Sequence, residues 1–342
     1  MNLSMKYLTV FFFLFCLSTI KSQETSTLFN RSNLSLFNPS FTGIDGSLAS
    51  LSTRSQWSGV EDAPRVNSFI YHFHKKKKVN LGIVIQNDKV FIENKTYLVF
   101  NYNYNLKLSE DRILYLGLKA GGYYNDININ EISDKRIFNT YNPALKPVES
   151  YINPVFGLGF NYVAPNYFLG IGMPNLFKNK RYKDSSEYKS TASDYSYFHF
   201  TLGSSIKLNE SIKINPLINY FSIPDDKNIF SANIDLSFND KYFIGPVLSN
   251  RNDLGLFLLL KLSSNFDLGY GYEFTSNAIS EVIKNPTHEL LLKIKFNKKI
   301  PNTLIIDIRD FTCGERGIRT PGGVTLNSFQ DCRIRPLCHF SS

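Results

Sequence analysis

Short runs in which apolar and polar residues alternate make up most of this chain. In the clearest run, residues 96–108 (TYLVFNYNYNLKL), Phe100 and Tyr102 fall on one face. Asn101 and Asn103 fall on the opposite face. Alternation with a period of two places apolar and polar side chains on opposite faces of a β-strand. The pattern therefore predicts strands that have one apolar face and one polar face.

Turn residues divide this pattern into fourteen predicted strands. Short polar connections such as Ser109–Arg112 and Asn239–Asp240 are typical of antiparallel neighbours. Two connections are longer, residues 126–152 and 175–194, and both are rich in Tyr and polar residues. The predicted strands are residues 46–57, 65–74, 79–89, 96–108, 113–125, 153–163, 167–174, 195–208, 212–221, 229–238, 242–250, 254–262, 265–273 and 287–296.

The apolar faces are unusually aromatic, since the chain has 29 Phe and 20 Tyr. A secreted β-sandwich or jelly roll would also alternate. Aromatic apolar faces and strands longer than five or six residues favour a membrane barrel instead. Unpaired backbone groups cost several kcal/mol in lipid, so such strands must close into a ring, and an even number is expected. We predict an all-β fold: a closed antiparallel transmembrane β-barrel of about 14 strands.

The beginning of the chain resembles a secretory signal peptide. Lys6 supplies a positive charge, and residues 8–17 (LTVFFFLFCL) form an apolar core too short to span a bilayer as a helix. An uncleaved anchor helix is the alternative. We expect cleavage between Ser22 and Gln23, which leaves a polar lead-in before the first strand.

The end of the chain does not continue the strand pattern. Residues 287–296 (THELLLKIKF) alternate and end in Phe296, which resembles the C-terminal signal of outer-membrane proteins. Residues 297–342 lack alternation and hold three of the four cysteines. From about residue 311 the amino-acid sequence resembles the reverse-strand translation of a serine transfer-RNA gene. We therefore interpret the tail as disordered, and the part from about residue 311 as spurious read-through. A zinc knuckle is the alternative, but the tail has no CxxC pair.

These observations predict four parts. They are a signal peptide at residues 1–22, an N-terminal periplasmic segment at 23–45, an outer-membrane barrel at 46–296 and a non-native-looking tail at 297–342.

Charge and reactive residues narrow the function. The net charge is +9, of which the leader carries +2 and residues 297–342 carry +3, so the body is too weakly basic to indicate a nucleic-acid partner. His72 and His74 could chelate a metal, yet no carboxylate lies nearby, and we interpret them as polar lumen residues. His199 and Ser205 belong to no recognisable lipid-hydrolase signature. We expect no catalytic, cofactor or metal site and no enzymatic activity.

Several short motifs along residues 30–296 resemble the PorP/SprF family of Bacteroidetes outer-membrane proteins in their order and spacing. One departure is Phe91, which stands where a glycine often follows the Asn-Asp-Lys motif. The residues that carry the resemblance are Asn38, Pro39, Gly43, Arg54, Gln56, Trp57, Gly59, Pro64, Asn87, Asp88, Lys89, Gly117, Gly121, Pro174, Asn175, His288 and Glu289. We interpret them as structural: Trp57 as an interfacial anchor, Gly43 and Gly59 as tight bends, and Pro174 as a strand end.

The resemblance implies a location in the outer membrane and a role in type IX secretion and gliding motility. It implies a barrel that helps a secreted surface protein, such as an adhesin, to be exported or to stay attached. Implied partners are outer-membrane lipid and lipopolysaccharide, type IX secretion components and the cargo itself. The alternative functions are a passive porin for small solutes and, more remotely, a lipid hydrolase.

Overall fold

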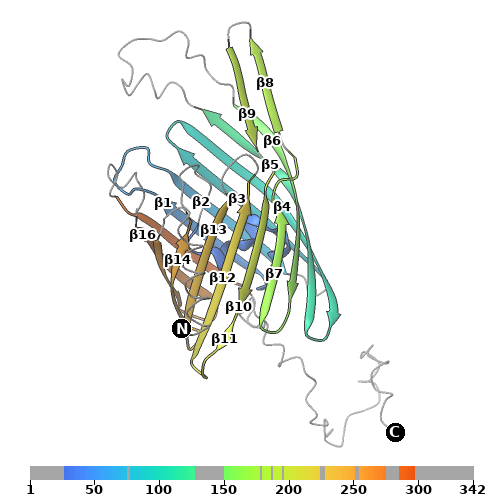
Figure 1. Cartoon of the computed structure of the whole chain (residues 1–342), viewed down its shortest axis with the longest axis vertical. Helices are drawn as coiled ribbons and strands as arrows, with labels where there is room; N and C mark the ends of the chain where they lie inside the picture. Colours follow the sequence, from blue (N-terminus) through green and yellow to red (C-terminus); the bar gives the residue numbers. More distant parts are fainter. Residues whose placement is uncertain are drawn as a thin grey trace, which may run out of the picture. The chain divides into compact units, whose positions relative to one another are not determined.

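A computed structural model describes residues 27–74, 78–127, 150–177, 179–185, 188–194, 196–223, 228–250, 254–274 and 285–296 (Figure 1). The described residues form two short helices and a set of antiparallel strands. The helices are α2 (Asn30–Phe37) and the 3-10 helix η1 (Pro39–Phe41). The strands are β1 (Leu48–Ser55), β2 (Arg65–His74), β3 (Val79–Val90), β4 (Glu93–Ser109), β5 (Arg112–Ile127), β6 (Tyr151–Val163), β7 (Tyr167–Met173), β8 (Asn179–Ser185), β9 (Tyr188–Asp194), β10 (Phe198–Ser204), β11 (Ile206–Lys207), β12 (Ile212–Ser222), β13 (Ile229–Phe238), β14 (Tyr242–Ser249), β15 (Leu254–Lys261), β16 (Phe266–Phe274) and β17 (Thr287–Lys295).

Fourteen of these strands form one closed ring. Neighbours in the sequence pair with each other, and the first strand, β1, pairs with the last, β17. The ring closes between β10 and β12, where Phe198 lies opposite Ser222. The two-residue strand β11 extends this contact along β12. The predicted closed antiparallel barrel of fourteen strands is therefore confirmed.

The alternation along the strands separates the outside of the barrel from its lumen. On β4, Leu98 and Phe100 are 46% and 54% exposed, whereas Val99 and Asn101 between them are 3% and 2% exposed. A lipid-facing apolar surface and a filled interior follow from this pattern. Among the described residues, no helix is both long and apolar enough to cross a membrane.

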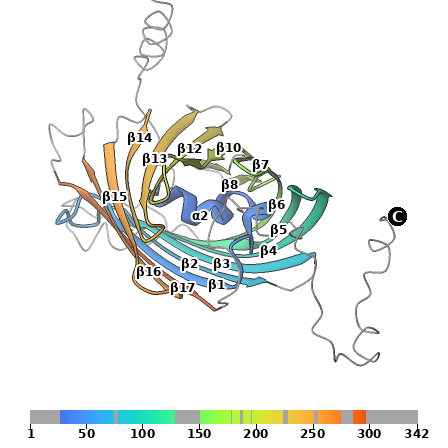
Figure 2. The same cartoon turned by 90° about the horizontal axis from the view of Figure 1, so that it is seen from below.

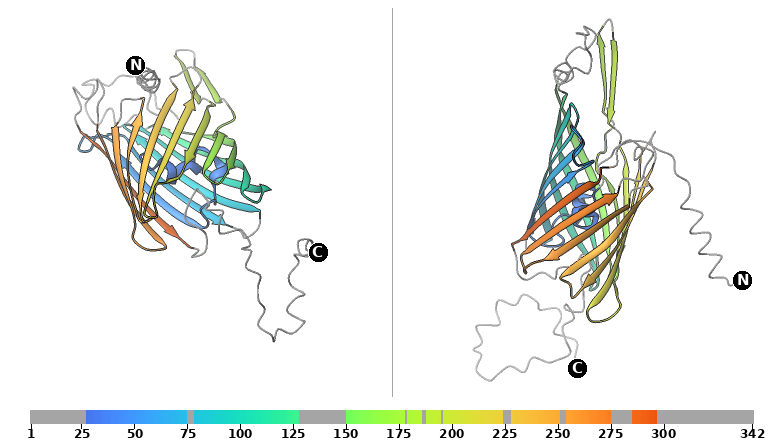
Figure 3. Two further views of the ribbon diagram at one scale, coloured as in Figure 1. Left: turned by 60° about the horizontal axis from the view of Figure 1, so that its bottom comes forward. Right: turned by 90° about the vertical axis from the view of Figure 1, so that its left-hand side faces the viewer.

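The two rims of the barrel differ. At one rim the strands are joined by short connections, such as those between β4 and β5 and between β13 and β14, and we call it the short-turn rim. The chain intervals from β5 to β6, from β7 to β10 and from β16 to β17 are longer, and the ends of β5, β7 and β16 lie at the opposite rim, which we call the long-connection rim (Figure 3). Leu48 pairs with Lys295, so the barrel begins and ends at the short-turn rim.

Three features differ from the sequence predictions. Residues 175–194, expected to be a plain connection, contain the antiparallel hairpin of β8 and β9, which forms a sheet of its own. Its sequence has no apolar face, so the pattern did not indicate strands. The predicted periplasmic segment contains the helix α2. Figure 2 shows α2 inside the ring of strands rather than outside it.

Candidate functional site

Residues 27–45, which we call the plug, lie within the barrel lumen (Figure 2). Their apolar side chains are almost fully buried against the inner wall. Leu34 and Phe41 pack with Phe168 of β7 and Leu217 of β12. On another side of the plug, Phe29 meets Phe257 edge to face. The segment predicted to be periplasmic is thus part of the interior, because it carries apolar groups that the barrel wall removes from water.

Asparagine side chains of the wall pair with the backbone of the plug. On β4, Asn101 donates to the carbonyl of Ser35 at 3.2 Å. Asn103 donates to the carbonyls of Ser40 and Thr42, at 2.9 and 2.7 Å. A buried backbone carbonyl without a partner would cost free energy, so these amides allow a non-strand segment to lie inside the barrel. The asparagines on the polar strand faces therefore form part of the surface that binds the plug.

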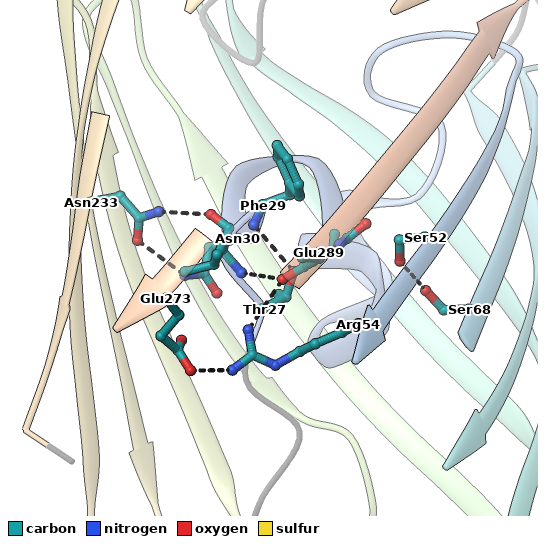
Figure 4. A network of polar contacts seen from close by, with 11 residues as sticks. Thr27, Phe29, Asn30, Ser52, Arg54, Ser68, Asn233, Glu273 and Glu289 are labelled. Atoms are coloured by element: carbon teal, nitrogen blue, oxygen red, sulfur yellow. Dashed lines mark hydrogen bonds and ion pairs between the residues drawn. The ribbon is translucent and has the colours of Figure 1, made fainter. Parts of the chain in front are cut away.

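A buried charged cluster fixes the start of the plug, and we call it the Arg54 network (Figure 4). Arg54 of β1 bonds Glu273 of β16 at 2.6 Å and Glu289 of β17 at 3.4 Å. Glu289 also accepts hydrogen bonds from the hydroxyl of Thr27 and, at 2.7 Å, from the backbone N–H of Leu28. Arg54 and Glu289 are 4% and 1% exposed. Buried charges at this depth require such pairing.

A second ion pair holds the helix. Arg31 of α2 lies 3.3 Å from Asp235 of β13, and it donates to the carbonyls of Asn215 and Pro216 on β12. Burial lowers the pKa of the Arg31 guanidinium, while the charge of Asp235 opposes that shift. Asn233, two residues before Asp235, accepts a hydrogen bond from the side-chain amide of Asn30 and donates one to the carbonyl of Leu28. Strand β13 therefore makes polar contacts with Leu28, Asn30 and Arg31 of the plug.

Lys119 of β5 binds the other end of α2. Its ammonium group donates to the carbonyl of Leu36 at 2.5 Å, at the C-terminal end of the helix. The last carbonyls of a helix have no partner within the helix and carry partial negative charge, so a cation is favoured there. Lys119 stands inside the Gly-Leu-Lys-Ala-Gly motif, between Gly117 and Gly121.

Two motif glycines allow the plug to approach the wall. A Cβ at Gly117 would lie 2.2 Å from the backbone nitrogen of Ser40, so any side chain there would displace η1. Gly43 has φ +72°, a left-handed conformation that favours glycine, and it packs against Asn80. At the start of η1, Asn38 accepts hydrogen bonds from the backbone and hydroxyl of Ser40. The Asn-Pro-Ser-Phe-Thr-Gly motif therefore forms the turn that seats the plug.

Other motif residues lie at the long-connection rim. Trp57 and Gly59 have positive φ in the turn after β1, where the backbone N–H of Gln56 donates to the carbonyl of Pro64. On β3, Asn87 bonds Asn94 and Thr96 of the neighbouring strand, and Asp88 and Lys89 follow it toward the rim. Pro174 comes directly after β7, and Asn175 accepts from the N–H of Phe177. These residues shape the turns.

The remaining predicted residues lie apart from the plug contacts. Gly121 packs against the backbone of β4, where a Cβ would lie 2.2 Å from the carbonyl of Leu98. His288 bonds the hydroxyl of Tyr270 at 2.8 Å on the outer wall. Phe296 is half exposed at the short-turn rim, beside Tyr71. Ser22, Gln23 and residues 297–342 lie outside the described residues.

The sequence motifs contain only part of this site. They include Asn38, Gly43, Arg54, Gly117 and Glu289, which the fold brings to the interface between plug and wall. Thr27, Arg31, Glu273 and Asp235 lie outside these motifs. For Glu273 and Asp235 the sequence signal is a charged residue on a lumen-facing strand face, which a water-filled pore would also show. Thr27 and Arg31 lie before the first strand, where no such pattern exists.

A cavity of about 480 Å³ lies on the long-connection side of the plug. Leu28, Leu36 and Phe37 contribute to it from the plug. A smaller cavity of about 90 Å³, lined by Lys213, Lys261 and Asp267 among others, lies toward the short-turn rim. No group of three or more His, Cys, Asp or Glu residues suited to a metal occurs in the described part of the chain.

Fold and site together define an outer-membrane β-barrel whose lumen contains residues 27–45 of its own chain. Residues 21–294 match the family model of the type IX secretion system membrane protein PorP/SprF. The chain belongs to this family, and it is a type IX secretion-associated barrel of the outer membrane.

No curated protein sequence matches the chain. Among solved structures, the toluene transporter TbuX of Ralstonia pickettii has a TM-score of 0.46 at 9% identity, covering 76% of this chain and 92% of its own. The P. putida toluene transporter TodX has a TM-score of 0.45 at 10% identity, covering 78% and 94%. The Acinetobacter baumannii outer membrane protein Omp33 has a TM-score of 0.43 at 11% identity, covering 75% and 100%.

Proposed function

We propose that this chain is a non-enzymatic accessory of type IX secretion that supports the export or surface attachment of a cargo protein such as an adhesin. The observation that carries the proposal is the plug. The lumen of the barrel is filled by residues 27–45, which the wall holds through buried ion pairs and hydrogen bonds. A barrel closed in this way is suited to binding and scaffolding rather than to free diffusion of solutes.

The proposed partners contact different parts of the molecule. Outer-membrane lipid, including lipopolysaccharide, faces the apolar exterior, where Phe100 and Phe160 are about half exposed. Short turns of bacterial barrels face the periplasm and long connections face outward. We therefore propose that the connections at residues 126–152 and 175–194 present the cargo-binding surface, and that the short-turn rim faces the secretion components in the periplasm. Export through a signal peptide cut between Ser22 and Gln23 is part of the same proposal.

A passive porin is the second candidate, because fourteen strands enclose a lumen wide enough for one. The plug counts against it, since Leu34, Asn38 and Phe41 are all at most 5% exposed and pack against the inner wall. A porin would require the plug to leave that position.

Deletion of the gene tests the secretion role. The expected result is that the surface protein encoded beside it is lost from the cell surface, while other type IX cargo is still secreted. Complementation with the wild-type gene should restore display. Unchanged display of the neighbouring cargo, with its secretion intact, would contradict the proposal.

A further inference from the structure

The larger cavity has an apolar lower tier next to the plug. Val84, Val99 and Val155 come from three strands and pack around Leu36 of the plug. Val84 and Val99 are direct cross-strand partners, and Gly121 continues the row to Val155. The lumen of an outer-membrane barrel is ordinarily polar, so an apolar row that borders a cavity is a specific feature of this wall.

A polar upper tier follows toward the long-connection rim. On β3 the lumen-facing series runs from Val84 to Gln86 and Asp88, and on β4 it runs from Val99 to Tyr97 and Lys95. Each step of two residues rises by about 7 Å, so the two tiers are separated by roughly the length of a small polar head. Tyr123 adds a further phenol ring.

The charges around the cavity balance. Its lining includes three cations, Arg54, Lys95 and Lys119. It also includes three carboxylates, Asp88, Glu93 and Glu273. Arg54 and Lys119 are already engaged with the carboxylates of the Arg54 network and with the plug. The cavity therefore has no net charge that would attract a strongly charged ligand of either sign. A ligand with an uncharged head group that carries several hydroxyls could form hydrogen bonds with the amides, carboxylates and tyrosines of the lining.

We infer that this cavity is a binding site for an amphipathic small molecule that combines a short apolar chain with an uncharged, hydroxyl-bearing head, as in an alkyl glycoside. The chain contacts the valine tier and the head contacts the tier of Gln86, Glu93 and Lys95. The volume of about 480 Å³ lies within the range of small-molecule sites. This site goes beyond the proposed secretion role and does not depend on it.

Equilibrium dialysis of hexyl β-D-glucoside against the full chain in detergent-free nanodiscs tests the site. We expect saturable binding of one molecule per barrel, and affinity that rises about fourfold for each CH₂ group between butyl and hexyl glucoside. Gln86→Trp should fill the cavity and weaken binding by at least about tenfold. Its matched control is Ile85→Trp, because Ile85 is the adjacent residue of β3 and is 40% exposed on the lipid-facing side.

The head and the site can each be refuted. Hexanoate should bind at least about tenfold more weakly than hexyl glucoside, because its head is charged. N-acetyl-leucine amide binding more tightly than hexyl glucoside would overturn the assigned head group in favour of a peptide ligand. Two results would overturn the site itself. One is uptake of hexyl glucoside that shows no saturable excess over protein-free nanodiscs. The other is equal binding of hexyl glucoside by both Trp variants, when gels show that both barrels are folded. None of these measurements depends on cargo display. The binding site and the secretion role can therefore be refuted independently of each other.

Discussion

Arg54 is the residue on which the plug and the barrel seam depend most directly. Its guanidinium joins β1 to Glu273 and Glu289 of the last two strands, and Glu289 in turn holds Thr27 and Leu28. Replacing a buried ion pair with apolar groups can be neutral, but removing one partner leaves an uncompensated charge. Arg54 is therefore the cation that compensates both buried carboxylates.

Arg54→Met should lower the free energy of unfolding by roughly 3–5 kcal/mol, because it leaves two buried carboxylates without their cation. Urea unfolding of the protein in lipid vesicles measures this change. Lys213→Met is the control, since its pair with Asp240 is partly exposed and should contribute at most about 1 kcal/mol. A similar loss of unfolding free energy in both variants would show that the buried Arg54 network contributes no more to stability than an exposed ion pair.

Phe91 occupies a backbone position that suits glycine. It has φ +52° in the tight turn between β3 and β4, where the family resemblance leads one to expect a glycine. Phe91→Gly should therefore stabilise the protein by about 1 kcal/mol relative to Phe91→Ala, which removes the ring but keeps the Cβ. The same urea titration compares the two variants. A less stable glycine variant would show that the turn is not strained.

At the scale of elements, the plug is held by geometry as well as by charge. α2 has only eight residues, a length at which an isolated helix is marginal in water, so its stability must come from packing against the wall. The close approach of η1 to Gly117 is part of that packing.

Gly117→Val should displace η1 and loosen the plug while the strands stay paired, because the new side chain would overlap the backbone of Ser40. Hydrogen exchange should then rise by at least about tenfold at the amides of residues 30–41, with little change in β4 and β5. Leu118→Val is the matched control, since Leu118 points outward and is 52% exposed. Equal protection in both variants would contradict the proposed contact.

The strands were predictable from sequence, whereas the plug was not. Period-two alternation is local, and residues 96–108 display it without any knowledge of their neighbours. The plug depends on contacts between residues far apart in the chain, such as Thr27 and Glu289, which are separated by 262 positions. The predicted closure of the barrel brings Arg54 and Glu289 onto neighbouring strands, but no local pattern indicates that Thr27 joins them. The β8–β9 hairpin was missed for a different reason, because it has no apolar face.

At the scale of the whole molecule, the barrel should not conduct ions freely in its plugged state. Planar-bilayer recordings of the full chain should show little steady current. Deleting residues 27–45 should raise single-channel conductance at least about tenfold, because nothing among the described strands then fills the lumen. Heat-modifiable migration on gels verifies that the deleted form still folds. A high steady conductance of the full chain would favour the porin alternative.

The pairing of β1 with β17 also bears on how the protein is assembled. Thr27 and Leu28 come first among the described residues, yet they bind Glu289, which belongs to the last strand. These bonds at the start of the plug can form only when the final strand has arrived. A chain whose insertion stops short of β17 lacks the pairing that closes the wall and also lacks the group that binds Thr27 and Leu28. Closure of the barrel and attachment of the start of the plug therefore depend on the same strand.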